Sequence, residues 1–237
     1  MPVMWQGIHF DPDHRGYILN IKKNITFRLT KYTSWYILSP MNKSEKTRRY
    51  IVEVASPIFN KKGYAGTSIS DVVESTGLTK GSIYGNFENK DELAIAALEH
   101  NFSKISGLIY SSFNDKKNSC DKLAAFAESY RLFYDVSMDF GGCPVMNAAV
   151  DSDDGNPLIK KRVEKFIMLW KKSLTTIIEN GKKDKEIKQD VDPESFSILF
   201  ISIIEGSLML SKTTGEKKYI NSAIDHIISL VDAMRAA

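Results

Sequence analysis

The sequence has few of the residues that build covalent or metal-bound frameworks. It contains two cysteines and four histidines in 237 residues, and it has no C-x-x-C pair. Two cysteines cannot form a disulfide framework in a chain of this length, and the histidines are too scattered for a metal-binding motif. The G-x-G-x-x-G, P-loop and H-E-x-x-H patterns of nucleotide-dependent and metal-dependent enzymes are also missing. We therefore expect no enzyme, no metal and no cofactor.

Long apolar runs are scarce as well. The least polar stretch, Phe196 to Leu210, is short for a transmembrane helix and is interrupted by Ser197, Ser202, Glu205 and Ser207. The first residues do not combine a basic start, an apolar run and a small-residue cleavage site, as a signal peptide would. We therefore expect a cytoplasmic protein with no membrane partner.

Residues 1–42 differ in character from the rest of the chain. They are rich in aromatic residues, contain three prolines and show no sustained helical or strand period. One interpretation is an N-terminal arm that folds onto the body or contacts a partner. The other, which we favour, is a non-native extension, with Met41 as the natural first residue. The intact mass of the protein made from its native gene distinguishes them, because a mass that includes residues 1–40 excludes the second.

From Ser44 onward the pattern is helical throughout. Apolar residues recur every three or four positions, which predicts a first helix that ends at Gly63 and is kinked at Pro57. Capping signals predict further helices after Ser68, Thr79, Asn89 and Asp192, and apolar periodicity predicts others from about Cys120, Pro157 and Ile220. The charged segment 182–189 is expected to be a solvated loop. No segment alternates like a strand, so the predicted fold class is all-α.

Residues 68–87 contain two short predicted helices joined by a tight turn. Gly77 ends the first helix, and Thr79 can cap the second only two residues later. With the longer helix before them they form a helix-turn-helix unit, whose second helix enters the major groove of DNA. Such corners are common in all-α proteins, so the spacing alone does not establish DNA binding.

The residues of this unit resemble the TetR/AcrR family of bacterial transcriptional regulators. The resemblance runs from Lys46 to about Leu98 without a gap and includes the segments TSISDVV (67–73), TGLTKGSIY (76–84) and NFENKDEL (86–93). Its hallmark is a small residue and an aliphatic residue before a tyrosine, followed by Phe, Lys and Leu. Beyond residue 100 only the plan is similar: several helices, a Gly-Cys-Pro break and Glu205-Gly206 in the penultimate helix.

The resemblance implies two domains after the N-terminal extension. Residues 43–103 would form the helix-turn-helix DNA-binding domain, and residues 104–237 a regulatory, ligand-binding and dimerisation domain. The implied protein is a repressor that binds a palindromic operator as a homodimer and is released by a small apolar or aromatic effector. Double-stranded operator DNA, the effector and a second copy of the chain are then its expected partners.

The predicted DNA contacts lie on and around the second helix of the motif. Lys80 can reach a guanine edge or a phosphate, and Gly81 and Gly85 allow the helix backbone to approach the groove. The full set is Thr67, Thr79, Lys80, Gly81, Ser82, Tyr84, Gly85, Asn86 and Lys90. Plainer roles remain open: Tyr84 could simply pack, Thr79 could only cap a helix and Lys90 could be solvated. Ile83 and Phe87 are assigned to the core.

Aromatic and methionine residues of the larger domain are the candidate effector-binding residues. They are Phe102, Phe126, Tyr130, Phe133, Met146, Phe166, Met168 and Trp170. The same stripes are also typical of an ordinary helical core, so this alternative stays open.

Cys143 lies in a Gly-Gly-Cys-Pro break and is a further candidate. At a helix N-terminus its thiolate would be stabilised, and the protein would then be a sensor of oxidants or electrophiles. The plainer alternative is a small buried hydrophobic residue. A third possibility for the whole chain is a helical ligand-binding protein without DNA-binding activity. The acidic residues Asp151, Asp153 and Asp154 lie close together, but such a loop is usually only solvated, and no metal site is expected.

The net charge of +3 is unevenly distributed. Residues 43–90 hold eight basic and five acidic residues, whereas residues 91–237 hold 19 basic and 22 acidic residues. A basic N-terminal unit on an acidic body is consistent with DNA binding at one end of the molecule.

Overall fold

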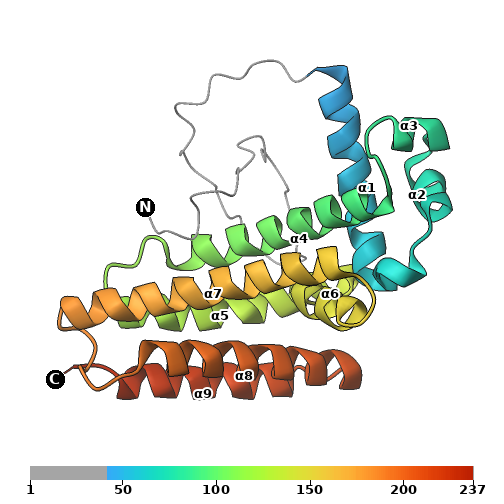
Figure 1. The fold of residues 1–237 in the computed structure, drawn as a ribbon. Coiled ribbons are helices and arrows are strands. Elements are labelled where there is room, and N and C mark those ends of the chain that lie inside the picture. The colour runs from blue at the N-terminus through green and yellow to red at the C-terminus, as the bar shows by residue number, and fades with distance from the viewer. Residues whose placement is uncertain (1–41, 237) are drawn as a thin grey trace, which may run out of the picture.

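The computed structural model describes residues 42–236, and Figure 1 shows the arrangement of their helices. The predictions made for the N-terminal extension, including Met41 as the first residue, lie outside the described residues except for Asn42, which caps the first helix. The helices are α1 (Lys43–Gly66), α2 (Ile69–Thr76), α3 (Lys80–Tyr84), α4 (Lys90–Phe113), α5 (Ser119–Ser137), α6 (Pro144–Ser152), α7 (Pro157–Lys183), α8 (Pro193–Thr214) and α9 (Lys218–Ala233). A 3-10 turn, η2 (Met138–Phe140), follows α5. Within residues 42–236 no strand forms beyond one isolated bridge between Ile187 and Arg235, so the all-α prediction is confirmed.

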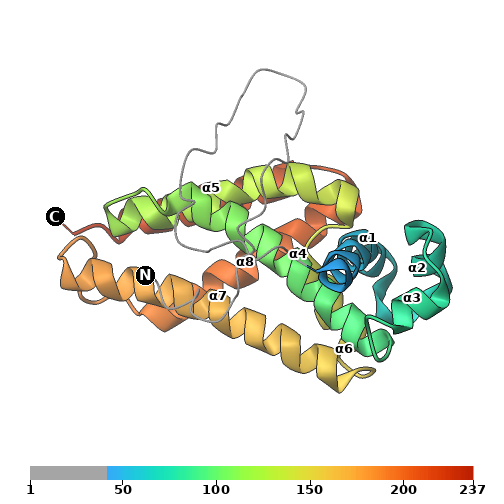
Figure 2. The ribbon, with the colours of Figure 1, turned by 90° about the horizontal axis from the view of Figure 1, so that it is seen from above.

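The helices divide the molecule into a small end and a larger body. In Figures 1 and 2, α1, α2 and α3 lie together at one end, and α4 runs from that end along the body. The body contains α5, α7, α8 and α9, with α5 packed on α9, α7 on α8 and α8 on α9. The short helix α6 contacts α1, α4 and α7 and lies at the junction. The domain boundary expected at residue 103 falls inside α4, so one continuous helix belongs to both parts.

The caps of the small end form as the sequence predicts. Ser68 and Asp71 make a reciprocal capping box at the start of α2. Gly77 ends α2 in the left-handed region, with φ of 67°. The Thr79 side chain then accepts a hydrogen bond from the backbone N–H of Ser82 at the start of α3, and Asn89 caps α4 in the same way.

The backbone of α1 leaves the helical region at Gly63, with φ of 73° and ψ of 175°. Gly63 is the residue at which the sequence predicts the end of the helix. Pro57 lies inside the helix, where the torsions stay helical, so the kink expected there stays a prediction. The assigned helix resumes briefly and extends to Gly66.

The segment after α7 is exposed along most of its length, as its charge predicts, but it begins later than expected and is anchored by one buried residue. The α7 helix continues past Gly181 to Lys183, and Ile187 is fully buried. A Cβ atom at Gly181 would lie 2.7 Å from Ile187 Cδ1 and 2.7 Å from Ser119 Cβ. A larger residue at position 181 would clash with these atoms, so the close packing of Ile187 requires glycine there. This contact holds the segment on the body.

The helix α8 is longer than its apolar core suggested. It runs on to Thr214, so by length and composition it is sufficient to cross a membrane, contrary to the expectation drawn from Phe196 to Leu210. A core or interface helix satisfies the same criterion, and α8 packs against α7 and α9. Only 39% of the most apolar stretch of α8 is buried, so apolar side chains of this helix also face outward.

Candidate functional site

The α2–turn–α3 unit is fixed to the rest of the small end by buried apolar side chains. Val72 of α2 and Ile83 of α3 are fully buried, and Phe87, just after α3, is 2% exposed. The assignment of Ile83 and Phe87 to the core is therefore confirmed. Because α3 has only five residues, its position depends on these anchors and on the Thr79 cap rather than on its own helical stability.

The opposite side of α3 is open and carries most of the predicted DNA contacts. Thr79, Lys80, Gly81, Tyr84 and Gly85 are exposed, and Ser82 is partly exposed. The ammonium group of Lys80 lies 5.9 Å from the centre of the Tyr84 ring. The tyrosine is 44% exposed, so it does not simply pack into the core. This face combines a cation, hydroxyl groups and accessible backbone, which are the groups that contact phosphates and base edges.

Of the three other predicted contacts, Thr67 is buried, and Asn86 and Lys90 are held by contacts within the protein. Thr67 is a correction: its side chain is 1% exposed, and its hydroxyl donates to the Gly63 carbonyl oxygen at 2.7 Å. The Asn86 amide donates to the Ser82 carbonyl oxygen at 2.9 Å, so it stabilises the end of α3. The Lys90 ammonium lies 4.2 Å from the centre of the Tyr64 ring and is partly exposed. Lys90 thus remains a candidate phosphate contact, but it is a constrained one.

Arg48 is a positioning residue that sequence reasoning missed. Its guanidinium carbon lies 4.0 Å from the centre of the Phe87 ring, and Nη2 is 2.8 Å from Glu92 Oε1. It also donates to the carbonyl oxygen of Asn86. Arg48 therefore ties α1 to the turn between α3 and α4 and holds α3 in place. Partners about 40 residues apart leave no local signal in the sequence.

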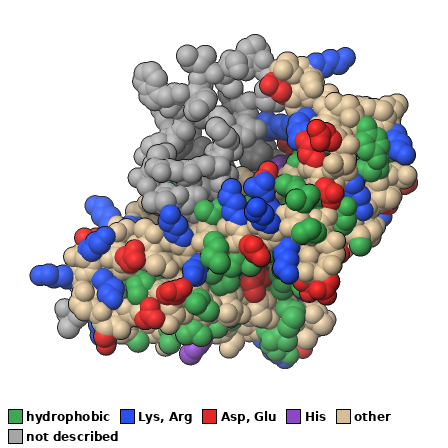
Figure 3. Space-filling model, viewed as in Figure 1, with side chains coloured by type: hydrophobic (Ala, Val, Ile, Leu, Met, Phe, Trp, Pro, Cys, Tyr) green, Lys and Arg blue, Asp and Glu red, His purple; other side chains and the backbone are tan. Residues whose placement is uncertain are grey.

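The charge of the small end is partly neutralised by its own ion pairs. Lys62 is 2.6 Å from Asp71, and Arg49 is 3.0 Å from Glu53. The hydrogen bond from Lys62, and then those from Ser68, hold the pKa of Asp71 far below its usual range. In Figure 3, basic, acidic and hydrophobic side chains are interspersed in the region of α2 and α3. The small end is thus modestly basic, and Lys80 is one exposed positive group on it.

The six aromatic members of the predicted effector-binding set are buried inside the body. Tyr130 stacks on Trp170 with ring centres 5.8 Å apart, and Phe102 stacks on Phe166 at 3.9 Å. Phe126 and Phe133 contact Tyr130, and all six rings are buried. Met146 is partly buried against this core, whereas Met168 is 58% exposed and is removed from the set.

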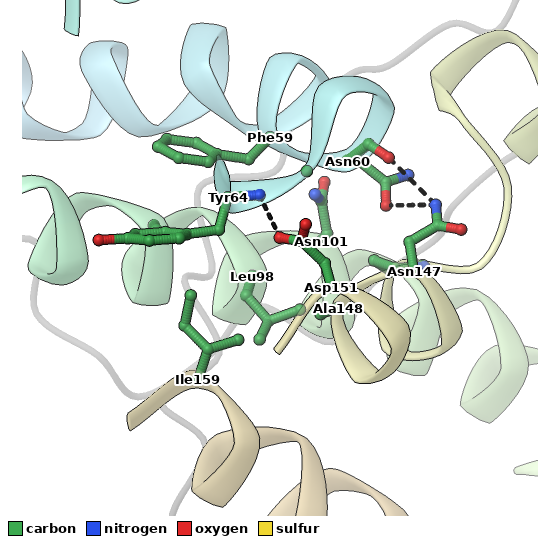
Figure 4. Close-up of a pocket in the computed structure, with 12 residues that line it drawn as sticks. Phe59, Asn60, Tyr64, Leu98, Asn101, Asn147, Ala148, Asp151 and Ile159 are labelled. Atoms are coloured by element: carbon green, nitrogen blue, oxygen red, sulfur yellow. Dashed lines mark hydrogen bonds between the residues drawn. The ribbon is translucent and has the colours of Figure 1, made fainter. Parts of the chain in front are cut away.

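A small pocket opens instead at the junction between the small end and the body. Figure 4 shows it between the end of α1 and helices α4, α6 and α7, and its lining includes Phe59, Tyr64, Leu98, Asp151 and Ile159. None of the predicted effector-binding residues lines this pocket.

Polar contacts at this junction connect α6 to α1. The Asn147 amide donates to the carbonyl and side-chain oxygens of Asn60 at 3.1 and 3.0 Å. Asp151 accepts the backbone N–H of Tyr64, directly after the break at Gly63. Asp151 therefore has a structural role and is not a free acidic group, and residues 42–236 contain no cluster of three or more metal-ligating side chains.

Of the two alternatives for Cys143, the structure supports the buried, unreactive thiol. It is the N-cap residue of α6 and is 6% exposed. Its sulfur lies 3.0 Å from Glu205 Oε1, so the thiol donates to the carboxyl group. Burial, followed by the nearby Glu205, raises the pKa of Cys143 well above its ordinary value and outweighs the helix N-terminus. The alternative of a stabilised thiolate is therefore not supported, and that of a buried thiol is.

Comparisons with known proteins cover both parts of the chain. The family described as "Bacterial regulatory proteins, tetR family" matches residues 51–97, and the one described as "Tetracyclin repressor-like, C-terminal domain" matches residues 119–227. A TetR transcriptional regulator from Chloroflexus aurantiacus is 34% identical with a TM-score of 0.79, over 83% of this chain and all of the other. A TetR-family regulator from Cytophaga hutchinsonii is 33% identical with a TM-score of 0.77, over 83% and 98%. The HTH-type transcriptional repressor DhaR of a Mycobacterium species is 22% identical over 70% of this chain and 82% of its own.

Proposed function

The chain belongs to the TetR family of bacterial transcriptional regulators, and on that premise we propose that it is a repressor that binds a palindromic operator as a homodimer and is released by a small molecule. The observation that carries the proposal is the exposed face of α3, which presents Lys80 and Tyr84 while Ile83 fastens the other side of the helix to the core. The repressor would act in the cytoplasm, where operator DNA is found.

We assign DNA contacts to the exposed residues of the predicted set. Lys80 would pair with a guanine edge or a phosphate, and the Tyr84 hydroxyl would donate to a phosphate. Gly81 and Gly85 would let the backbone of α3 approach the groove, and Thr79 and Ser82 would contact the sugar–phosphate backbone. Asn86 and Lys90 lie at the rim of this face and complete the proposed set.

The proposed homodimer is supported by the outward face of α8. Ile198, Leu199, Met209 and Leu210 are each between 43% and 53% exposed, and they recur at helical spacing. Gly206, between them, has no atom within 4 Å of a Cβ built on it, so the backbone of a partner helix could come close. In Figure 3 hydrophobic side chains are visible along the lower edge, where α8 and α9 lie. Two copies paired through this face would present two α3 helices to successive half-sites.

The proposed response to an effector is supported by the position of α6. This helix begins at Cys143 in the interior of the body and contacts the end of α1 through Asn147 and Asp151. An effector that binds one position of α6 better than another would therefore also favour one position of α1 and the DNA-binding unit.

A thiol sensor acting through Cys143 is the second candidate from the sequence, and the buried, hydrogen-bonded thiol argues against it. A helical ligand-binding protein without DNA-binding activity is the third, and the exposed α3 face argues against it.

DNA binding is tested with fluorescently labelled DNA from upstream of the protein's own gene. Lys80→Ala and Tyr84→Ala should each weaken binding by about 1–3 kcal/mol without lowering the free energy of unfolding. Lys165→Ala, which removes an exposed charge from α7 in the body, is the matched control and should leave the affinity unchanged. Affinity should also fall steeply with salt because phosphate contacts release counterions. If the wild type and all three variants bind the DNA with equal affinity, α3 is not the DNA-contacting helix.

The homodimer is tested by sedimentation. Leu199→Glu should dissociate the dimer because it places a charge in an apolar interface. Leu158→Glu is the control, since Leu158 is equally apolar and 56% exposed but lies at the start of α7. A Leu199→Glu variant that stays dimeric would exclude this face of α8 as the interface.

A further inference from the structure

Glu205 brings a carboxyl group into the interior of the body. It lies on α8, and its Oε1 accepts the hydrogen bond from the Cys143 thiol. The other oxygen, Oε2, is buried and has no hydrogen-bond partner among the described residues. A carboxylate oxygen that is removed from water without a partner is costly, so the fold retains this group at a loss of stability.

A stacked pair of aromatic side chains, Tyr130 and Trp170, lies near this carboxyl group. Tyr130 is 3% exposed, and burial, followed by the nearby Glu205 and Cys143, raises its pKa well above its ordinary value. Trp170 stacks on Tyr130, and its Nε1 is a second buried polar atom without a partner. Thus an unpaired acceptor and an unpaired donor both lie near the ring of Tyr130.

We propose that Glu205 is the anchor of the effector site and that the effector is a protonated amine carried on an aromatic or apolar framework. The proposal rests on the proposed repressor function and specifies the chemistry of its ligand. Glu205 Oε2 would accept a hydrogen bond from the ammonium group, and the aromatic rings would favour an organic cation over its hydration by water. Trp170 Nε1 would donate to an acceptor atom elsewhere on the ligand.

The same contact connects the ligand to the DNA-binding unit. The Glu205 carboxyl group holds Cys143, which is the N-cap residue of α6. The two residues before Cys143, Gly141 and Gly142, have φ of 99° and 83°, so the chain enters α6 through a segment that other residues would not adopt easily. An ammonium group that draws Glu205 away from Cys143 would release the start of α6, whose other end holds α1 through Asp151.

The proposal is tested with two probes of nearly equal shape, 1-naphthylmethylammonium and 1-naphthylmethanol. Binding to the full-length protein is measured by calorimetry for the wild type, for Glu205→Gln and for the control Glu164→Gln, which changes an exposed glutamate of α7. The ammonium should bind the wild type at least about tenfold more tightly than the alcohol, since only the ammonium forms an ion pair. Glu205→Gln should abolish this preference, and Glu164→Gln should keep it.

A second measurement needs no variant. An ammonium ion beside Glu205 favours the ionised carboxylate, so its binding should release a proton near pH 7, and the observed binding enthalpy should depend on the ionisation enthalpy of the buffer. The alcohol should release none.

Equal affinity of the wild type for both probes, an undiminished preference in Glu205→Gln, or no binding of either probe would overturn the proposal. A DNA-binding assay on the same samples separates it from the proposed function. DNA binding without an ammonium preference overturns the effector chemistry alone, whereas an ammonium preference without DNA binding supports the site and overturns the repressor.

Discussion

Replacing Glu205 by glutamine should change how the stability of the fold depends on pH. Burial raises the pKa of this carboxyl group from 4.5 to about 7, even though the hydrogen bond from Cys143 acts in the opposite direction. The folded protein therefore keeps a proton on Glu205 at pH values at which the unfolded chain has already lost it. Glutamine has the same shape but no proton to lose, so the Glu205→Gln variant lacks this effect.

The sign and size of the effect follow from the two pKa values. Between pH 4.5 and about 7 the folded state binds more protons than the unfolded state, so the free energy of unfolding falls as pH rises. Each unit of difference corresponds to about 1.4 kcal/mol, which gives a total loss of about 3 kcal/mol. The stabilisation is fully present below pH 4.5, declines through this window and is gone above pH 7.

The measurement is urea-induced unfolding at a fixed protein concentration, because unfolding of the proposed dimer would depend on concentration. The free energy of unfolding of the wild type minus that of Glu205→Gln, taken at each pH, removes the contributions of all other titrating groups. This difference should fall by about 3 kcal/mol between pH 4.5 and pH 8. The same difference for Glu164→Gln, an exposed position on α7, should stay constant. A difference that is constant for Glu205→Gln, or that rises with pH, would refute the reasoning.

Three further predictions concern the small end and the two thiols. Arg48→Ala removes the contact with the Phe87 ring, the ion pair with Glu92 and the hydrogen bond to the Asn86 carbonyl oxygen. In urea-induced unfolding it should lower the free energy of unfolding by about 1–2 kcal/mol, and it should also weaken DNA binding. Arg48→Lys should recover part of both losses. Gly77→Ala should cost about 1 kcal/mol of stability in thermal unfolding, because its φ of 67° disfavours a Cβ atom, whereas Gly81→Ala in α3 should cost nothing. A thiol reagent should leave Cys120 and Cys143 unlabelled in the native protein and label both after denaturation, since both are buried with raised pKa values. Rapid native labelling of Cys143 would contradict the last of these.

Local chemistry explains why the small end could be predicted closely. The Ser68 capping box, the left-handed Gly77 and the Thr79 cap each depend on residues within four positions of one another. The spacing of Ile83 and Phe87 identified the buried side of α3, and so it also identified the exposed side that carries Lys80. Short-range signals of this kind need no knowledge of the rest of the fold.

The sequence predicted the helices of the body well, but it could not distinguish effector-binding residues from core residues. Periodicity indicated which faces of α5 and α7 are buried, but the same apolar stripe describes a packed core and an effector pocket equally well. Met168 is exposed and therefore does not belong to the predicted effector-binding residues, and Thr67 is buried and therefore cannot contact DNA. Neither outcome has a local cause, because each depends on which neighbouring helix covers that position.

The sequence by itself determined the all-α fold, the helix-turn-helix unit and the buried and exposed sides of α3, because helix periodicity and end caps depend on residues that lie close together in the chain. Only the tertiary structure decided how Arg48 holds α3, how Asp151 holds the end of α1, and that Cys143 meets Glu205 across 62 residues. These contacts depend on how whole helices pack, and the polarity of a buried group depends on what surrounds it. The environment of Cys143 and Glu205 therefore follows from the tertiary packing and not from the local sequence.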